Sequence, residues 1–127
     1  PATMVATRLE QLGAGRVGAT AGWSINVSRQ PELPNTCITI YDTGGASDDT
    51  DEMDIRRPTF QVRVRSFNYN EMVSKLDQIK TLLTGSTFGD GGQTFMDISM
   101  SSDMATLLPD DKDRHAATLN FTSIVST

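Results

Sequence analysis

The stretch RPTFQVRVRS, residues 57–66, together with NYNEMVSKLDQIKTLLTG at 68–85, decides the fold. The first segment alternates apolar and polar residues, which is the period of a strand with one buried face. Its apolar set is Phe60, Val62 and Val64, and its polar set is Gln61, Arg63 and Arg65. A strand of this kind needs an apolar layer packed against one of its faces.

The second segment supplies that layer, because it predicts an amphipathic helix over about 69–84. Asn68 and Glu71 have the spacing of a capping box, and Gly85 stands where a glycine commonly closes a helix. The apolar residues recur at helical spacing on one side, at Met72, Leu76, Ile79 and Leu83. A one-sided stripe predicts a helix that packs across a sheet.

The remaining segments add elements around this pair. A weaker helical spacing covers residues 4–12, and GWSINVS, CITIYD, QTFMDISM and RHAATLNFTSIV have strand-like patterns. Residues 43–57 lack any apolar period, so we interpret them as an exposed loop that ends at Pro58. The sequence therefore predicts a single domain over 1–127 with an α+β fold. We expect a mostly antiparallel sheet with an N-terminal helix and the central amphipathic helix packed on one face.

Composition limits the function. The chain has 127 residues, a formal net charge of −5 and a single cysteine, Cys37. An acidic balance disfavours tight nucleic-acid binding, because neutralised phosphates supply most of the non-specific affinity. A lone cysteine excludes a disulfide within these residues and a cysteine-based zinc site. No apolar run reaches about 18 residues, so no membrane span is expected.

The pentapeptide YDTGG at 41–45 is similar to the catalytic turn of retroviral-type aspartic proteases. That chemistry needs two carboxylates sharing a proton, so the chain would have to dimerise to bring two copies of Asp42 together. No second apolar-apolar-glycine element of that fold is found, and a strong central helix is foreign to it. We therefore interpret Asp42 to Gly45 as the turn that ends a strand, and a dimeric protease as the less favoured alternative.

Charged residues gather between the two central strands. The acidic side chains of this segment are oxygen ligands of the kind that bind Ca²⁺ or Mg²⁺, but their spacing is not that of an EF-hand. We therefore interpret the segment as a solvated loop and expect no bound metal. Acidic and basic patches on one chain suit a head-to-tail ring, in which the loop of one copy meets a strand of the next. The candidate interface or lumen residues are Asp48, Asp49, Asp51, Glu52, Arg56, Arg57, Arg63 and Arg65. No catalytic residue is assigned.

From Asn35 to Val125 the order of motifs resembles the tail terminator, or tail completion, proteins of long-tailed phages, which are also called minor capsid or minor tail proteins. The features that carry the resemblance are IYDTGG, a variable polar loop, RPTFQVRVRS leading into a helix that ends at glycine, and the closing RHAATLNFTSIV. The acidic insert at 46–54 departs from the pattern.

This resemblance implies a structural virion protein without enzyme activity or cofactor. Such proteins form a ring, usually a hexamer, at the head-proximal end of the tail tube. The ring stops tube polymerisation and joins the tail to a head-completion, or connector, protein, and DNA passes through its lumen without specific binding. The resemblance also implies assembly in the host cytoplasm and a final place at the head–tail interface of the virion. Another head–tail joining or tail-tube protein of the same particle is the alternative.

Overall fold

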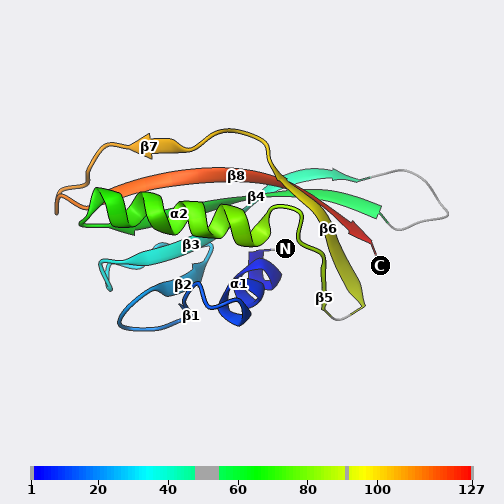
Figure 1. Ribbon diagram of the computed structural model, residues 1–127, viewed down its shortest axis with the longest axis horizontal. Helices are drawn as coiled ribbons and strands as arrows, with labels where there is room; N and C mark the ends of the chain where they lie inside the picture. Colours follow the sequence, from blue (N-terminus) through cyan, green and yellow to red (C-terminus); the bar gives the residue numbers. More distant parts are fainter. Residues whose placement is uncertain (1, 48–54, 91, 127) are drawn as a thin grey trace.

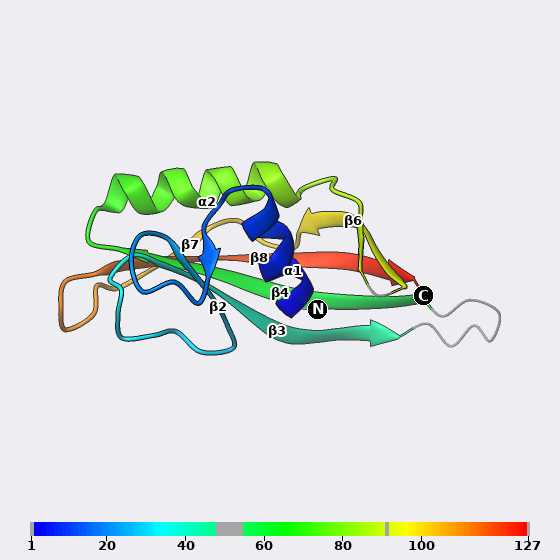
Figure 2. The same ribbon diagram turned by 90° about the horizontal axis from the view of Figure 1, so that it is seen from below.

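The computed structural model describes residues 2–47, 55–90 and 92–126, which form one sheet and two helices (Figures 1 and 2). No helix in these ranges is long and apolar enough to cross a membrane. The elements are α1 (Ala2–Gln11), β1 (Arg16–Val17), β2 (Ser24–Val27), β3 (Cys37–Ser47), β4 (Ile55–Ser66), α2 (Tyr69–Leu83), β5 (Phe88–Asp90), β6 (Gln93–Met100), β7 (Ala105–Leu107) and β8 (His115–Ser126).

The sheet has the strand order β1-β2-β3-β4-β8-β6-β5. β6 pairs with the second half of β8, and β7 pairs with its first half along the edge opposite β4. The β1–β2 and β2–β3 pairs are parallel, and the other pairs are antiparallel. Figure 2 shows α1 and α2 on the same side of this sheet. The predicted fold class is therefore confirmed.

The core lies between the sheet and the two helices. Each apolar residue predicted to point inward from β4 has an apolar partner on β8, as in the Val62–Leu119 and Phe60–Phe121 pairs. The two phenylalanine rings stack with their centroids 5.1 Å apart. The predicted stripe of α2 is fully buried against this layer, at Met72, Leu76, Ile79 and Leu83.

Both ends of α2 use the predicted residues. The Asn68 side chain accepts a hydrogen bond from the Glu71 backbone N–H, at 3.0 Å. The Glu71 carboxylate accepts from the Ser66 hydroxyl, at 3.3 Å, and that hydroxyl accepts from the Asn68 backbone N–H, at 3.1 Å. Ser66 thus links the two halves of the capping box. Gly85 follows the helix with a φ of +74°, a conformation that glycine adopts without strain.

The prediction of a loop over residues 43–57 is wrong at both ends of that range. β3 continues to Ser47 and β4 already begins at Ile55, so Pro58 lies inside a strand and faces Gly45 across the pair. The register shifts by one residue between Asp42 and Gly44, which is a β-bulge, and Gly44 has a φ of +98°. The strand can therefore pass YDTGG without stopping. Residues 48–54 lie outside the described ranges.

Candidate assembly surfaces

The face of the sheet that carries no helix is polar and largely hydrogen-bonded to itself. The Gln61 amide donates to the Asn120 side chain at 3.1 Å, and Asn120 donates in turn to the Ser102 hydroxyl at 3.0 Å. Two hydroxyl pairs extend this pattern, Thr43 with Thr59 at 2.7 Å and Ser99 with Thr122 at 3.1 Å. Many of the uncharged polar side chains on this face are therefore hydrogen-bonded to one another.

The predicted basic residues are distributed over both faces. Arg57 and Arg56 lie on β4, opposite Ala46 and Ser47 of β3, and both are exposed. Strand alternation places Arg57 and Arg63 on the helix-free face and Arg56 on the other. The Arg63 guanidinium lies 5.4 Å from the centre of the Tyr41 ring. The predicted acidic candidates Asp48, Asp49, Asp51 and Glu52 lie outside the described residues.

Arg65 was expected to be exposed on this face, and that expectation is wrong, because only 2% of the residue is accessible. The PELPN segment folds across the end of the sheet and presents its backbone carbonyls to the guanidinium. Arg65 Nε donates to the Asn35 carbonyl at 3.2 Å, and Nη2 donates to the Pro34 carbonyl at 2.9 Å and the Glu32 carbonyl at 3.3 Å. Arg65 therefore ties a loop to the sheet inside the protomer.

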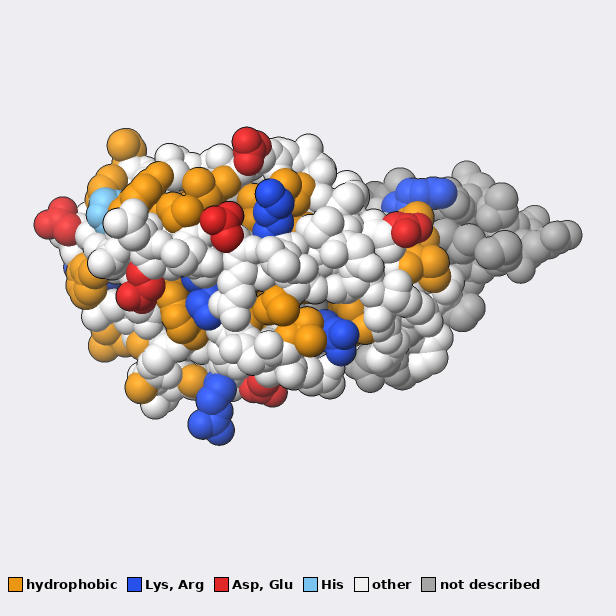
Figure 3. All heavy atoms as spheres, in the orientation of Figure 1, with side chains coloured by type: hydrophobic (Ala, Val, Ile, Leu, Met, Phe, Trp, Pro, Cys, Tyr) orange, Lys and Arg blue, Asp and Glu red, His pale blue; other side chains and the backbone are white. Residues whose placement is uncertain are grey.

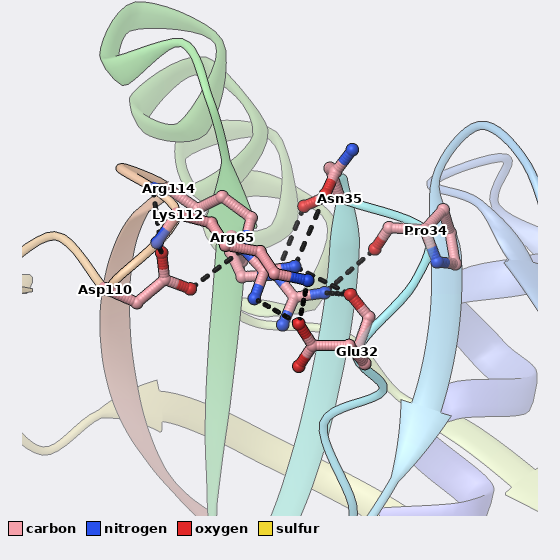
Figure 4. Close-up of polar contacts among 7 residues, drawn as sticks. All are labelled: Glu32, Pro34, Asn35, Arg65, Asp110, Lys112 and Arg114. Carbon is pink, nitrogen blue, oxygen red and sulfur yellow. Dashed lines mark hydrogen bonds and ion pairs between the residues drawn. The ribbon is translucent and has the colours of Figure 1, made fainter.

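A second buried arginine, Arg114, completes an arginine clamp that we define by Glu32, Asn35, Arg65, Asp110 and Arg114 (Figure 4). Arg114 is 3% exposed. Its Nε donates to the Asp110 carboxylate at 2.8 Å, and its Nη1 donates to the Glu32 carbonyl at 2.7 Å. The clamp thus joins the loop before β3 to the turn before β8, which are far apart in the sequence. Sequence reasoning missed it, although Asp110 and Arg114 stand four residues apart in PDDKDR.

The clamp perturbs its carboxylates. The Arg114 backbone N–H and guanidinium hold the pKa of Asp110 below its ordinary value of 3.8. The hydrogen bond and charge of Lys112, with Arg114 nearby, lower the pKa of Glu32 from 4.5. A carboxylate with a lowered pKa stabilises the fold above its ordinary pKa, and this contribution is lost as the pH falls through the lowered value.

We therefore expect the urea midpoint of unfolding to fall as the pH drops below about 4, as this linkage requires. The measurement is a urea titration at several pH values between 7 and 2. Asp110→Asn is the matched variant, because it removes one of the two titrating groups and keeps an oxygen acceptor. It should show a shallower pH dependence than the parent, and an identical slope would contradict the role of Asp110.

Beside the clamp lies an apolar area that we call the corner patch, formed by Phe67, Tyr69, Leu107, Leu108 and His115. Leu108 is 92% exposed, Phe67 52%, Tyr69 46% and Leu107 41%. Tyr69 meets the His115 ring edge-on, with centroids 5.8 Å apart. In Figure 3 hydrophobic side chains gather around the histidine at one end of the molecule. Contiguous exposed apolar groups of this kind mark interaction surfaces.

Asp42 has a structural partner that explains its position. Its Oδ1 accepts a hydrogen bond from the Ala2 backbone N–H at 2.9 Å, so the carboxylate lies at the first turn of α1. Such an acceptor satisfies an N–H that the helix itself leaves unpaired. Asp42 also lies in the interior of β3, and not at a strand end as predicted.

We expect Asp42→Ala to lower the free energy of unfolding by about 1 kcal/mol, the usual cost of losing a helix cap. Asp42→Asn keeps a side-chain oxygen and should cost less than half as much. Urea denaturation of both variants measures the difference. The same Asp42→Asn variant tests the protease alternative, because a proteolytic activity that this variant abolishes would support a catalytic role for Asp42.

Among residues 2–47, 55–90 and 92–126, no three His, Cys, Asp or Glu side chains gather in a way that could hold a metal ion.

One family model and several solved structures match this chain. Residues 8–127 match the family described as bacteriophage tail terminator protein. A chain in the structure "Virion of native gene transfer agent (GTA) particle" has a similar fold, with a TM-score of 0.69 and 11% identity over 81% of this chain and 78% of that chain. A second solved structure has a TM-score of 0.56 and 12% identity over 95% of this chain and 89% of that chain. No curated protein sequence matched the chain significantly.

The two solved structures share the fold of this chain, but their sequence identities of 11% and 12% are too low to indicate a shared function. The family match covers nearly the whole chain, including the last part of α1 from residue 8, all of α2 and all described strands of the sheet. It confirms the resemblance noted from the order of motifs. The chain belongs to the bacteriophage tail terminator protein family, a family of structural virion proteins and not of enzymes.

Proposed function

We propose that this protein forms a ring at the head-proximal end of a phage tail, where it ends tail-tube polymerisation and joins the tail to the head. The observation that carries the proposal is the match to the tail terminator family along residues 8–127. The shared fold with a chain of a gene transfer agent virion supports a place in a phage-like particle. The ring, with six copies as the expected number, would assemble in the host cytoplasm and contact the tube protein on one side and a head-completion protein on the other.

The charge distribution supports a DNA-conducting ring. Five of the 16 acidic residues stand at positions 48–54, which leaves eleven acidic residues against the 11 Lys and Arg. The whole formal net charge therefore comes from that segment. We propose that Asp48, Asp49, Asp51 and Glu52 face the lumen or a neighbouring copy, because a negative lumen repels phosphate and lets DNA slide. A ring structure with all four facing bulk solvent on the outside would contradict this.

The test compares phage that carry the gene with phage that lack it. Without the protein, we expect overlong tails that fail to join heads, and the purified protein should form rings in negative-stain micrographs. A plasmid copy of the gene should restore tail length. Tails of normal length beside unfilled heads would instead assign a head-completion role, and normal virions would contradict the proposal outright.

A further inference from the structure

Four strand edges in the described part of the sheet lack a second neighbouring strand, namely the outer sides of β1, β5 and β7 and the part of β3 beyond Tyr41. The edges of β7 and of β3 beyond Tyr41 lie on opposite sides of the sheet. β2 pairs with β3 only as far as Ile40, so from Tyr41 onward β3 has β4 on one side and no strand on the other. β7 pairs with β8 through Ala105 to Leu107, and no described strand pairs with its outer side. In Figure 1 both segments lie at the margin of the sheet.

Both edges carry some of the usual guards against pairing, because β7 has only three residues and β3 is bulged beside Asp42, but neither β7 nor the stretch from Gly44 to Ser47 contains a charged residue or a proline. Sheets commonly guard an exposed edge with charged residues, proline or a covering element. The residues of β7 are uncharged and all exposed, and the next residue, Leu108, is 92% exposed. Beyond its bulge β3 pairs regularly with β4 from Gly44 to Ser47, without a charged residue or a proline. By contrast β1, the edge strand beside β2, carries Arg16.

The directions of these two strands fit each other in a ring. β3 and β8 run the same way, because each is antiparallel to β4, and β7 runs opposite to β8. In a ring all copies keep one orientation relative to the axis, so β3 of one copy would meet β7 of the next as an antiparallel pair. The two edges lie toward opposite ends of the strands. Their pairing would therefore stagger neighbouring copies and tilt the strands to the ring axis, as in a closed barrel.

We infer that the outer edge of β7 in one copy pairs with β3 beyond Tyr41 in the next, so that the sheets join into a continuous belt. This inference rests on the proposed ring and names the contact that builds it. The occupant of each edge is a second copy of the chain, since the chain itself carries two complementary edges and a head-to-tail contact uses both. The incoming strand would also cover Leu107 and Leu108 of the corner patch, which are the most exposed leucines beside β7.

Cross-linking between introduced cysteines tests this contact. The native Cys37 will not compete, because it is fully buried and burial raises the pKa of its thiol. Thr43→Cys and Thr106→Cys, combined in one chain and treated with a short bismaleimide, should give a ladder of covalent multimers. Each single variant should give no ladder. The matched pair Val17→Cys with Thr106→Cys probes β1 as the alternative edge and should stay monomeric after denaturation; a ladder from this pair would overturn the inference.

A charge on the proposed contact gives a second measurement. Thr106→Lys should weaken ring formation at least tenfold in sedimentation velocity, while the chain keeps its circular dichroism spectrum. Val17→Lys places the same charge on β1 and should leave the rings unchanged. Rings that persist in Thr106→Lys, without cross-links from the Thr43–Thr106 pair, would overturn the strand pairing and leave the ring standing. A parent protein that forms no ring would overturn both the pairing and the proposed function.

Discussion

Replacing Phe121 by alanine is expected to lower the free energy of unfolding by about 3–5 kcal/mol, the range for deleting a large aromatic side chain from a core. Phe121 is fully buried on β8 and stacks on Phe60, with ring centroids 5.1 Å apart. The substitution removes apolar surface from the core and leaves a cavity that the surrounding strands can close only in part. Urea denaturation followed by far-UV circular dichroism measures the loss.

Two matched variants serve as controls for the Phe121→Ala measurement. Phe121→Leu keeps most of the volume and should cost about 1 kcal/mol, as volume-conserving changes do. Phe67→Ala removes the same ring from a position that is 52% exposed, and should change stability by about 0.5 kcal/mol or less. If Phe121→Ala were no more costly than Phe67→Ala, the stacked pair would not be part of the core.

The second large effect is expected at the arginine clamp. Arg114→Ala should lower the free energy of unfolding by about 3 kcal/mol, the lower part of the range for breaking a buried charge pair. The guanidinium is 3% exposed, and its removal takes away the donor to Asp110 Oδ2 and one of the two arginine donors to the Glu32 carbonyl. We take the lower part of that range because the Asp110 side chain is 34% exposed and water replaces part of the lost contact.

Lys112→Ala is the control for this prediction. Lys112 also contacts Glu32, but their side chains are 48% and 67% exposed. An exposed pair of this kind contributes little to stability, because water screens the two charges. Equal losses from Arg114→Ala and Lys112→Ala would refute the clamp as a buried structural tie. Arg114→Lys should remain well below the parent, because an ammonium group cannot reproduce the fork of donors that Arg114 directs at two loops.

The elements that sequence reasoning placed correctly are those whose signal is local. Helix α2 carries its cap, stripe and closing glycine within one segment, so its limits at Tyr69 and Leu83 follow from nearby residues. The inward and outward residues of β4 near the helices follow from alternation, because one face there meets a core. Beyond Phe60 toward Ile55 the helices no longer cover the strand. The alternation of apolar and polar residues is absent from this part of the strand, and for this reason the sequence predicted a loop there.

The arginine clamp could not be predicted from the sequence for a different reason. Arg63 and Arg65 have the same place in the alternating pattern, yet only Arg65 is buried, because the loop at Glu32 to Asn35 crosses it. The covering residues lie about thirty positions earlier in the chain, and nothing in the pattern of β4 announces them. β1 was missed because two residues paired only through the backbone leave no side-chain period.

The position of β8 in the sheet has a consequence for synthesis. β8 comes last in sequence among the described strands, but it lies between β4 and β6 in the middle of the sheet, where it joins Ile55 to Ser126 across 71 positions. Until it emerges, β4 lacks one of its two neighbours and α2 has no complete layer beneath it. The domain therefore cannot be completed before β8 is synthesised, and contacts over such sequence distances form slowly. A chain that lacks β8 therefore leaves a gap in the middle of the sheet between β4 and β6.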